Sequence, residues 1–251
     1  MSDTNADSLL ARRIAEAAGK LLLTLRDSGM FSGKALGDAG DQIANAMILR
    51  ALAQERPGEA VLSEESADCS DRLNCSRVWI VDPLDGTREY SEGRDDWAVH
   101  IALAIDGQPA VGAVALPEMG ITLATDTPPA LPRTNDPVRM VVSRTRPAPE
   151  AVAIAEQTGA ELVPMGSAGA KAMAVVRGEA DIYLHSGGQY EWDSCAPIAV
   201  ARAAGLHVSR IDGSPMVYNM AEVWLPDLLI CRKEAAPALL ASVRDFAQGA
   251  R

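Results

Sequence analysis

Apolar residues recur at helical spacing in the first part of the chain. Residues 9–25 carry apolar side chains at intervals of three and four, and Ser8 is expected to cap this helix. A second helix is expected over about residues 41–54, with Ile43 and Ile48 on its inner face. The chain therefore begins with two amphipathic helices.

Short apolar runs follow and predict strands at 60–62, 78–81, 97–105 and 108–116. The last two flank Asp106-Gly107, a dipeptide that favours the tight turn of a β-hairpin. Four prolines between residues 126 and 137 predict a linker.

Beyond that linker, short apolar runs alternate with helical patterns. Strands are expected at 138–142, 161–165, 181–185, 207–211 and 228–231, and helices at 148–157, 167–177 and 194–204. We expect an α+β first half at residues 1–127 and an α/β second half at residues 138–251. The fold class is a layered α/β sandwich.

Composition narrows the possible partners. The 251 residues include 34 acidic and 23 basic side chains, which argues against nucleic-acid binding because such proteins need basic surfaces. Four cysteines without a CxxC pair, an acidic N-terminus and the lack of a long apolar run predict a cytoplasmic protein without a membrane span.

The acidic residues are concentrated in one region. Residues 38–96 hold 14 acidic and 6 basic side chains. Such a run is either a solvated surface or a cation site that folding assembles.

The segment 79–87 reads WIVDPLDGT, so an apolar strand leads directly into two carboxylates three residues apart. Asp82, Asp85 and the Leu84 carbonyl offer the hard oxygen ligands that Mg²⁺ prefers. Gly86 and Thr87 would begin a helix whose free N–H groups favour a phosphate. A turn with a helix cap is the simpler alternative for this pair.

Two other acidic motifs could contribute carboxylates to the same cation site. Glu64-Glu65 comes after the preceding apolar run, and Asp193 opens an Ala-rich helix. A solvated pair and a helix cap are their ordinary explanations, and the local pattern alone favours the cap for Asp193.

Glu64-Glu65, WIVDPLDGT and Trp192-Asp193, in this order, resemble the lithium-sensitive, magnesium-dependent phosphatases of the inositol monophosphatase and fructose-1,6-bisphosphatase superfamily. The resemblance implies alternating α-β-α-β-α layers, two or three Mg²⁺ ions and inhibition by Li⁺. The implied metal ligands are Glu64, Asp82, the Leu84 carbonyl, Asp85, Asp193 and Asp41.

The family also has a Thr-x-x-x-Asp segment at the start of its second helix. Gly37-Asp38-Ala39-Gly40-Asp41 is the best match, and Asp38 stands near the place of the usual threonine. The missing threonine concerns the binding of a third metal ion, because the resemblance assigns that ion to Asp41.

Within the family, the segment 84–90, LDGTREY, resembles the CysQ-type nucleotidases, whereas inositol monophosphatases more often show Thr-Asn-Phe after the DG pair. The implied activity is magnesium-dependent removal of the 3′-phosphate of adenosine 3′,5′-bisphosphate (PAP) to give AMP, and also conversion of the sulfated analogue PAPS to APS, in sulfur assimilation. Inositol monophosphate or fructose-1,6-bisphosphate as substrate is the alternative. A non-catalytic regulator that binds a phosphorylated ligand is a third.

The resemblance also implies residue roles. Thr87, Glu64 and Asp41 would orient the attacking water and take its proton. The implied substrate contacts are Leu84, Asp85, Gly86, Thr87, Ser143, Arg144, Ser167, Lys171 and Asp193. A cap at Ser167 and a surface position for Lys171 are the alternatives there.

The remaining expectations concern partners and unassigned residues. The three histidines, His100, His185 and His207, belong to no catalytic motif and are expected in core or surface roles. With 4% aromatic residues, no side chain is singled out for stacking on adenine. A small phosphorylated substrate is the expected partner, and homodimerisation is common in the resembled family.

Overall fold

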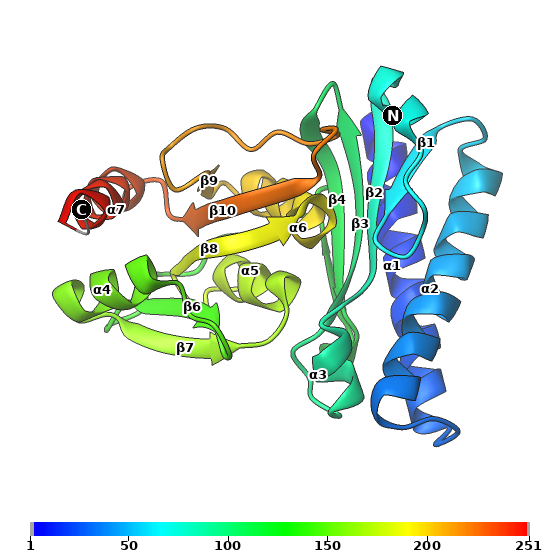
Figure 1. Ribbon diagram of the computed structural model, residues 1–251, viewed down its shortest axis with the longest axis horizontal. Helices are drawn as coiled ribbons and strands as arrows, with labels where there is room; N and C mark the ends of the chain where they lie inside the picture. Colours follow the sequence, from blue (N-terminus) through cyan, green and yellow to red (C-terminus); the bar gives the residue numbers. More distant parts are fainter. Residues whose placement is uncertain (1–2, 250–251) are drawn as a thin grey trace.

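The computed structural model describes residues 3–249, in which helices and sheets alternate as α-β-α-β-α layers (Figure 1). The expected fold class is confirmed. Two five-stranded sheets form the β layers, and each is built from one side of the segment between residues 125 and 138.

The first sheet has the order β1-β2-β3-β4-β5. Its strands are β1 (Ala60–Ser63), β2 (Arg77–Asp85), β3 (Ala98–Ile105), β4 (Gln108–Leu116) and β5 (Ile121–Ala124). Only β1 and β2 run parallel. The expected hairpin joins β3 to β4, and Asp106 (φ 50°) and Gly107 (φ 74°) both take the left-handed backbone conformation of a two-residue turn.

Helices α1 (Asp3–Asp27) and α2 (Gly33–Glu55) cover the outer face of this sheet. The expected cap at Ser8 is wrong, because α1 starts earlier and the buried Ser8 hydroxyl lies 2.8 Å from the Thr125 hydroxyl. The inner-face position of Ile43 is also wrong. Its side chain is 38% exposed.

The phase of α2 explains the position of Ile43. Ala44, Ile48 and Leu52 are buried, and their spacing of four residues defines the stripe of α2 that packs on the first sheet. Ile43 lies beside this stripe.

The second sheet has the order β7-β6-β8-β10-β9. Its strands are β6 (Arg139–Ser143), β7 (Glu161–Met165), β8 (Ile182–Tyr190), β9 (His207–Ser209) and β10 (Trp224–Cys231). Strand β8 is longer than the apolar pattern predicts, because its polar end pairs with β10 around a bulge between Leu225 and Asp227.

Two helices lie between the sheets, α5 (Ala168–Val176) and α6 (Glu191–Ala203), while α4 (Pro149–Thr158) and α7 (Ala236–Gly249) cover the far face (Figure 1). The short elements are α3 (Thr87–Ser91), η1 (Ser70–Asn74) and η2 (Pro117–Met119). No helix within residues 3–249 is long and apolar enough to cross a membrane.

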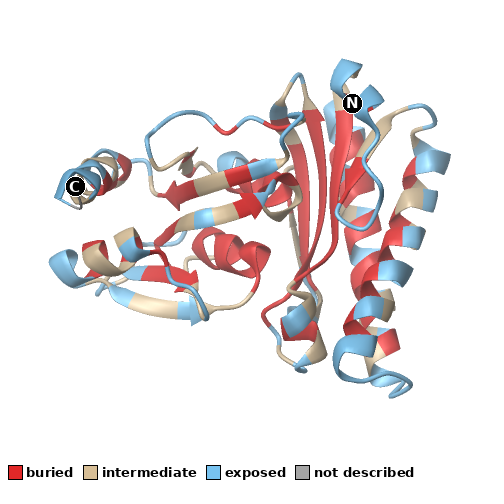
Figure 2. Cartoon of the chain, viewed as in Figure 1, coloured by how far each residue is buried: buried red, intermediate tan, exposed pale blue. Residues whose placement is uncertain are grey.

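Buried residues concentrate on the sheets and on the helix faces turned toward them (Figure 2). The central cluster includes Val114 of the first sheet, Ile198 of α6 and Ile230 of the second sheet, so the two halves share one core. Their separation into domains at 1–127 and 138–251 is a proposal.

Gly112 of β4 sets how closely α6 approaches the first sheet. A Cβ atom at this position would lie 2.5 Å from the Ala196 carbonyl oxygen. Only glycine allows this close packing, which places the start of α6 near the end of β2.

Candidate metal and substrate site

Three carboxylates meet where β2 ends and α6 begins. Asp82 and Asp85 come from β2, and Asp193 comes from the first turn of α6. One oxygen from each lies within 4.8 Å of the other two. The fold therefore brings together three of the predicted metal ligands, one of them more than 100 residues from the others in the chain.

Asp85 is held by the first turn of α5. Its Oδ2 accepts the Gly169 N–H at 2.6 Å, and its Oδ1 accepts the Ala168 N–H at 3.2 Å. Burial raises the pKa of Asp85, but His100 and the Gly169 N–H outweigh burial and hold the pKa below its ordinary value. Asp85 is therefore kept ionised inside the protein.

His100 is a site residue that the sequence did not reveal. This fully buried side chain on β3 places Nε2 3.2 Å from Asp85 Oδ2, and its Nδ1 lies 3.0 Å from the Trp192 carbonyl oxygen. The contact with Asp85 is an ion pair rather than an aligned hydrogen bond. Burial opposes the charge, but Asp85 raises the pKa of His100 above its ordinary value.

One signal could have found His100. It interrupts the otherwise apolar strand β3 and points toward the same side as Ala98 and Ala102, which belong to the central core. A buried polar side chain needs a partner, and here that partner is Asp85.

Thr87 connects Asp41 to the end of β2. Its hydroxyl lies 3.2 Å from the Leu84 carbonyl oxygen and 3.4 Å from Asp41 Oδ1. Asp41 was expected at the start of the second helix, but it lies inside α2, which begins at Gly33. The prediction started this helix too late, because small and polar residues predominate in its first two turns and give little apolar periodicity.

The carboxylates around this point repel one another. Burial and then Glu65 raise the pKa of Asp41 to about 7. Much of the Glu64 side chain is exposed, but its carboxyl group is partly enclosed by the protein. This enclosure, and then repulsion from Asp193 and Asp41, raises the pKa of Glu64 to about 7. Their negative charge needs compensation.

The pKa values of Asp82 and Asp193 are raised as well. Burial and the nearby Glu64 raise the pKa of Asp82 well above its ordinary value. Burial and Asp85 raise the pKa of Asp193 to about 6. Asp193 also accepts the Tyr190 N–H at 2.6 Å, so it caps α6 and belongs to the cluster at once.

The donor set fits a divalent cation. Its members are carboxylate oxygens and one backbone carbonyl, which are the ligands that hard cations take. Burial first, and then repulsion between neighbouring carboxylates, raises the pKa of Asp41, Glu64, Asp82 and Asp193, so both effects oppose their negative charge. A bound cation would compensate that charge.

The predicted substrate contacts on α5 have different surroundings. Ser167 caps α5 by accepting the Ala170 N–H at 3.0 Å. Lys171 is buried rather than on the surface, donates to the Ser167 carbonyl at 2.7 Å and also to the Gly166 carbonyl, and lies 5.5 Å from the centre of the Tyr183 ring. Burial lowers its pKa.

The other two predicted contacts follow β6. Arg144 pairs with Glu89 of α3 at 2.7 Å and with Glu92, the residue that follows α3, at 2.8 Å. Ser143 is half-buried and accepts the Arg146 N–H at 3.2 Å. Arg144 therefore connects the second half to α3, the helix that begins with Thr87.

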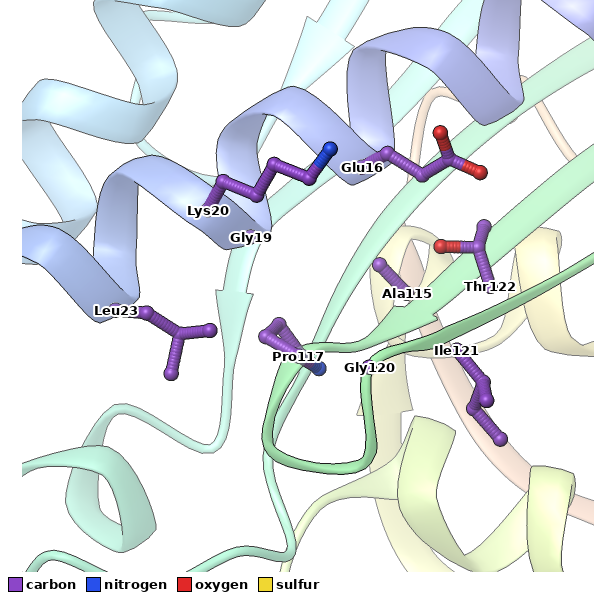
Figure 3. A pocket seen from close by; sticks show the side chains of 9 residues that line it. All are labelled: Glu16, Gly19, Lys20, Leu23, Ala115, Pro117, Gly120, Ile121 and Thr122. Atoms are coloured by element: carbon purple, nitrogen blue, oxygen red, sulfur yellow. The ribbon is translucent and has the colours of Figure 1, made fainter.

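A separate groove of about 450 Å³ lies between α1 and the β4–β5 edge of the first sheet (Figure 3). Its charged side chains are Glu16 and Lys20, and apart from Thr122 the other side chains that line it, such as Leu23 and Pro117, are apolar. It shares no residue with the carboxylate cluster. The groove therefore lacks the chemistry of the site at β2.

Comparison with known proteins gives consistent results. The model of the "Inositol monophosphatase family" matches residues 10–248. A 3′-phosphoadenosine 5′-phosphate phosphatase of Mycobacterium tuberculosis is 53% identical over 242 residues, which cover 91% of this chain and 90% of the relative. The 3′(2′),5′-bisphosphate nucleotidase CysQ of Escherichia coli is 32% identical over 199 residues, which cover 74% of this chain and 81% of the relative.

Solved structures agree on the fold. The crystal structure of CysQ from Bacteroides thetaiotaomicron superimposes with a TM-score of 0.76 at 25% identity, covering 91% of this chain and 98% of that one. Inositol monophosphatase from Anabaena gives a TM-score of 0.79 at 21% identity and 96% coverage of both chains, which shows the fold alone. The chain belongs to the inositol monophosphatase family.

Proposed function

We propose that the chain is a magnesium-dependent 3′(2′),5′-bisphosphate nucleotidase that hydrolyses the 3′-phosphate of PAP to give AMP and phosphate. The observation that carries the proposal is the meeting of Asp82, Asp85 and Asp193 in a chain 53% identical to a PAP phosphatase. PAPS is the expected second substrate, and sulfur assimilation the expected setting.

Glu64, Asp82, the Leu84 carbonyl, Asp85, Asp193 and Asp41 would hold two or three Mg²⁺ ions. When bound, these ions supply positive charge to the phosphoryl and leaving oxygens of the substrate. The arrangement of Asp85 supports the proposal, because α5 and His100 keep this ligand ionised without any cation.

Thr87, Glu64 and Asp41 are proposed to orient the attacking water and to take its proton. The Thr87 hydroxyl lies 3.4 Å from Asp41 Oδ1 and 3.2 Å from the Leu84 carbonyl oxygen. It has a single proton and donates to one of these two acceptors at a time, so its lone pairs are left to accept a hydrogen bond from the water. A carboxylate bound to Mg²⁺ is a weaker base, so the proton would go to whichever of Asp41 and Glu64 the ions leave uncoordinated.

The chain would bind the phosphorylated substrate through residues around the cluster. Leu84, Asp85, Gly86, Thr87, Ser143, Arg144, Ser167, Lys171 and Asp193 are the proposed contacts. Lys171 is buried and donates to the Ser167 carbonyl, so it would need to leave this partner to reach a phosphate. Arg144 would need to leave Glu89 or Glu92 to reach a phosphate.

The decisive experiment compares phosphate release from PAP, PAPS, inositol monophosphate and fructose-1,6-bisphosphate in Mg²⁺, as kcat/KM. PAP should be the best substrate. EDTA should abolish the activity, Mg²⁺ should restore it, and millimolar Li⁺ should inhibit it. Activity that survives chelation would exclude the metal, and a preference for inositol monophosphate would exclude the nucleotidase.

The same preparation tests the remaining proposals. A chain that binds AMP but releases no phosphate from any substrate would be a regulator rather than an enzyme. Light scattering tests the proposed homodimer, and fractionation of cells tests the proposed cytoplasmic location.

A further inference from the structure

Half of the aromatic side chains of this protein belong to its core. The chain has four Trp, four Tyr and two Phe residues. Half of these ten are almost completely buried: Trp79, Trp97, Tyr90, Tyr183 and Tyr218. Of the other five, Tyr190, Trp192 and Trp224 gather where β8 ends and α6 begins. Outside the core, aromatic side chains are thus concentrated at one place.

Tyr190 and Trp192 form a parallel stack. Their ring centroids are 4.9 Å apart and their planes differ by 11°. Trp192 is half-buried against the central core, whereas Tyr190 is 47% exposed. The indole therefore supports one face of the phenol ring, and much of the phenol ring is left to solvent.

Trp224 flanks this stack from the neighbouring strand. It is the direct partner of Tyr190 in the antiparallel pairing of β8 and β10, so the two side chains leave the sheet on the same side. Trp224 is 46% exposed. A Cβ atom at residue 188 would lie only 2.4 Å from the indole Nε1 of Trp224. Gly188, with φ of 97°, makes room for the indole over the strand.

The aromatic group adjoins the carboxylate cluster directly. The Tyr190 N–H donates to Asp193 at 2.6 Å, and the Trp192 carbonyl contacts His100, which in turn contacts Asp85. Backbone atoms of both stacked residues therefore touch the cluster or its immediate support. Both rings are therefore carried by residues at the edge of the cluster.

We propose that Tyr190, backed by Trp192 and flanked by Trp224, is the surface on which the purine base of the substrate stacks; this rests on the proposed function. The base would add a third layer to the Trp192–Tyr190 stack. A planar base gains from such stacking, and the two rings lose little freedom because Trp192 already holds Tyr190. A substrate without a base gains nothing from these rings, so the surface would favour nucleotides over sugar or inositol phosphates.

Tyr190→Ala and Tyr190→Phe test this inference in the Mg²⁺-loaded full chain. The alanine variant should lower kcat/KM for PAP about 10-fold, mainly through KM, because base–aromatic stacking is of that order. The phenylalanine variant keeps the ring and should behave like the unmodified chain. AMP binding, measured by calorimetry, should weaken to the same extent in the alanine variant only.

Two controls separate stacking from a structural effect. Phe246→Ala removes a half-buried aromatic ring from α7, on the far face of the second sheet. It should leave kcat/KM unchanged for PAP and for a phosphate ester without a base. The Tyr190→Ala substitution should lower kcat/KM much less for glycerol 2-phosphate, which has no base, than for PAP. An equal loss on both substrates, or no loss on PAP, would overturn the inference.

The remaining outcomes are also informative. If Tyr190→Ala converts a dimer to a monomer with unchanged AMP affinity, the rings form an interface between copies and the inference is wrong. If the unmodified chain releases no phosphate from PAP, the proposed function fails. The AMP titration still reports on the stacking surface in that case.

Discussion

The backbone N–H of Gly169 donates to Oδ2 of Asp85 at 2.6 Å, a bond that joins α5 of the second half to the end of β2 in the first. The neighbouring Ala168 N–H reaches the other oxygen of the same carboxylate at 3.2 Å. The start of a helix is a favourable place for an anion, and here a protein carboxylate occupies it. The layered fold thus holds a predicted metal ligand ionised before any metal binds.

Gly169→Ala should disrupt this arrangement. A Cβ atom at residue 169 would lie 2.0 Å from His100 Nε2 and 3.0 Å from Asp85 Oδ2. Since both neighbours are buried, we expect a loss of about 1–3 kcal/mol in the free energy of unfolding, typical of overpacking, together with a large fall in kcat. Urea unfolding and phosphate release measure the two effects.

The double variant Gly169→Ala/His100→Ala identifies the cause of that loss. If the clash with His100 dominates, the glycine substitution should destabilise the His100→Ala background less than the unmodified chain. Equal destabilisation in both backgrounds would show that the contact with His100 is not responsible.

Asp82→Asn should separate stability from activity. Asp82 is buried beside Glu64 and Asp85, and their repulsion disfavours its charge. Removing the charge should stabilise the metal-free protein at pH 8 and reduce turnover in Mg²⁺ to near zero. Thermal unfolding in EDTA and phosphate release in Mg²⁺ test both statements.

Asp245→Asn, on α7 in the far layer, is the matched control and should change neither quantity. An Asp82→Asn protein with unchanged kcat would contradict the role of Asp82 as a metal ligand. A less stable metal-free variant would contradict the repulsion within the cluster.

Much of the site could be predicted because its chemistry is encoded locally. Asp82 and Asp85 follow an apolar strand within one short motif, and Asp193 opens a helix whose inner face is rich in alanine. Apolar periodicity also predicted most helices and the β3–β4 hairpin. Family resemblance then related motifs that lie far apart in the chain.

The rest depends on contacts that no local pattern records. His100 meets Asp85 only because β3 pairs with β2 and α5 packs over both. The end of β8 is polar and contains Gly188, so it resembles a loop until β10 pairs with it. Tyr190 and Trp192 attract attention only after their stacking and exposure are seen.

The contribution of Asp41, Glu64 and Asp193 to the stability of the metal-free protein should fall as the pH rises from about 4 to 7. The folded-state pKa values of Asp41 and Glu64 are about 7 and that of Asp193 is about 6, all above their ordinary values. The folded protein therefore retains protons that the unfolded chain releases near pH 4, and this stabilising contribution is lost as the pH passes the folded pKa values. The lowered pKa of Asp85 acts only below this window.

Urea unfolding in EDTA across this pH range measures the effect. Saturating Mg²⁺ should weaken the fall in stability, because the cation replaces the protons. Asp193→Asn should reduce the slope in EDTA, whereas a slope equal to that of the unmodified chain would exclude Asp193 as a contributor.

Thr87→Ala should lower kcat about 10²-fold, within the range typical for loss of assistance to proton transfer, and leave the fold intact. The Thr87 hydroxyl is 3.2 Å from the Leu84 carbonyl oxygen and 3.4 Å from Asp41 Oδ1, and alanine removes both contacts. Thr87→Ser keeps the hydroxyl and should retain kcat within a few fold. Single-turnover phosphate release measures the chemical step separately from product release. A Thr87→Ala protein as fast as Thr87→Ser would show that the hydroxyl does not act on the water, and the proton would then have to pass directly to Glu64 or Asp41.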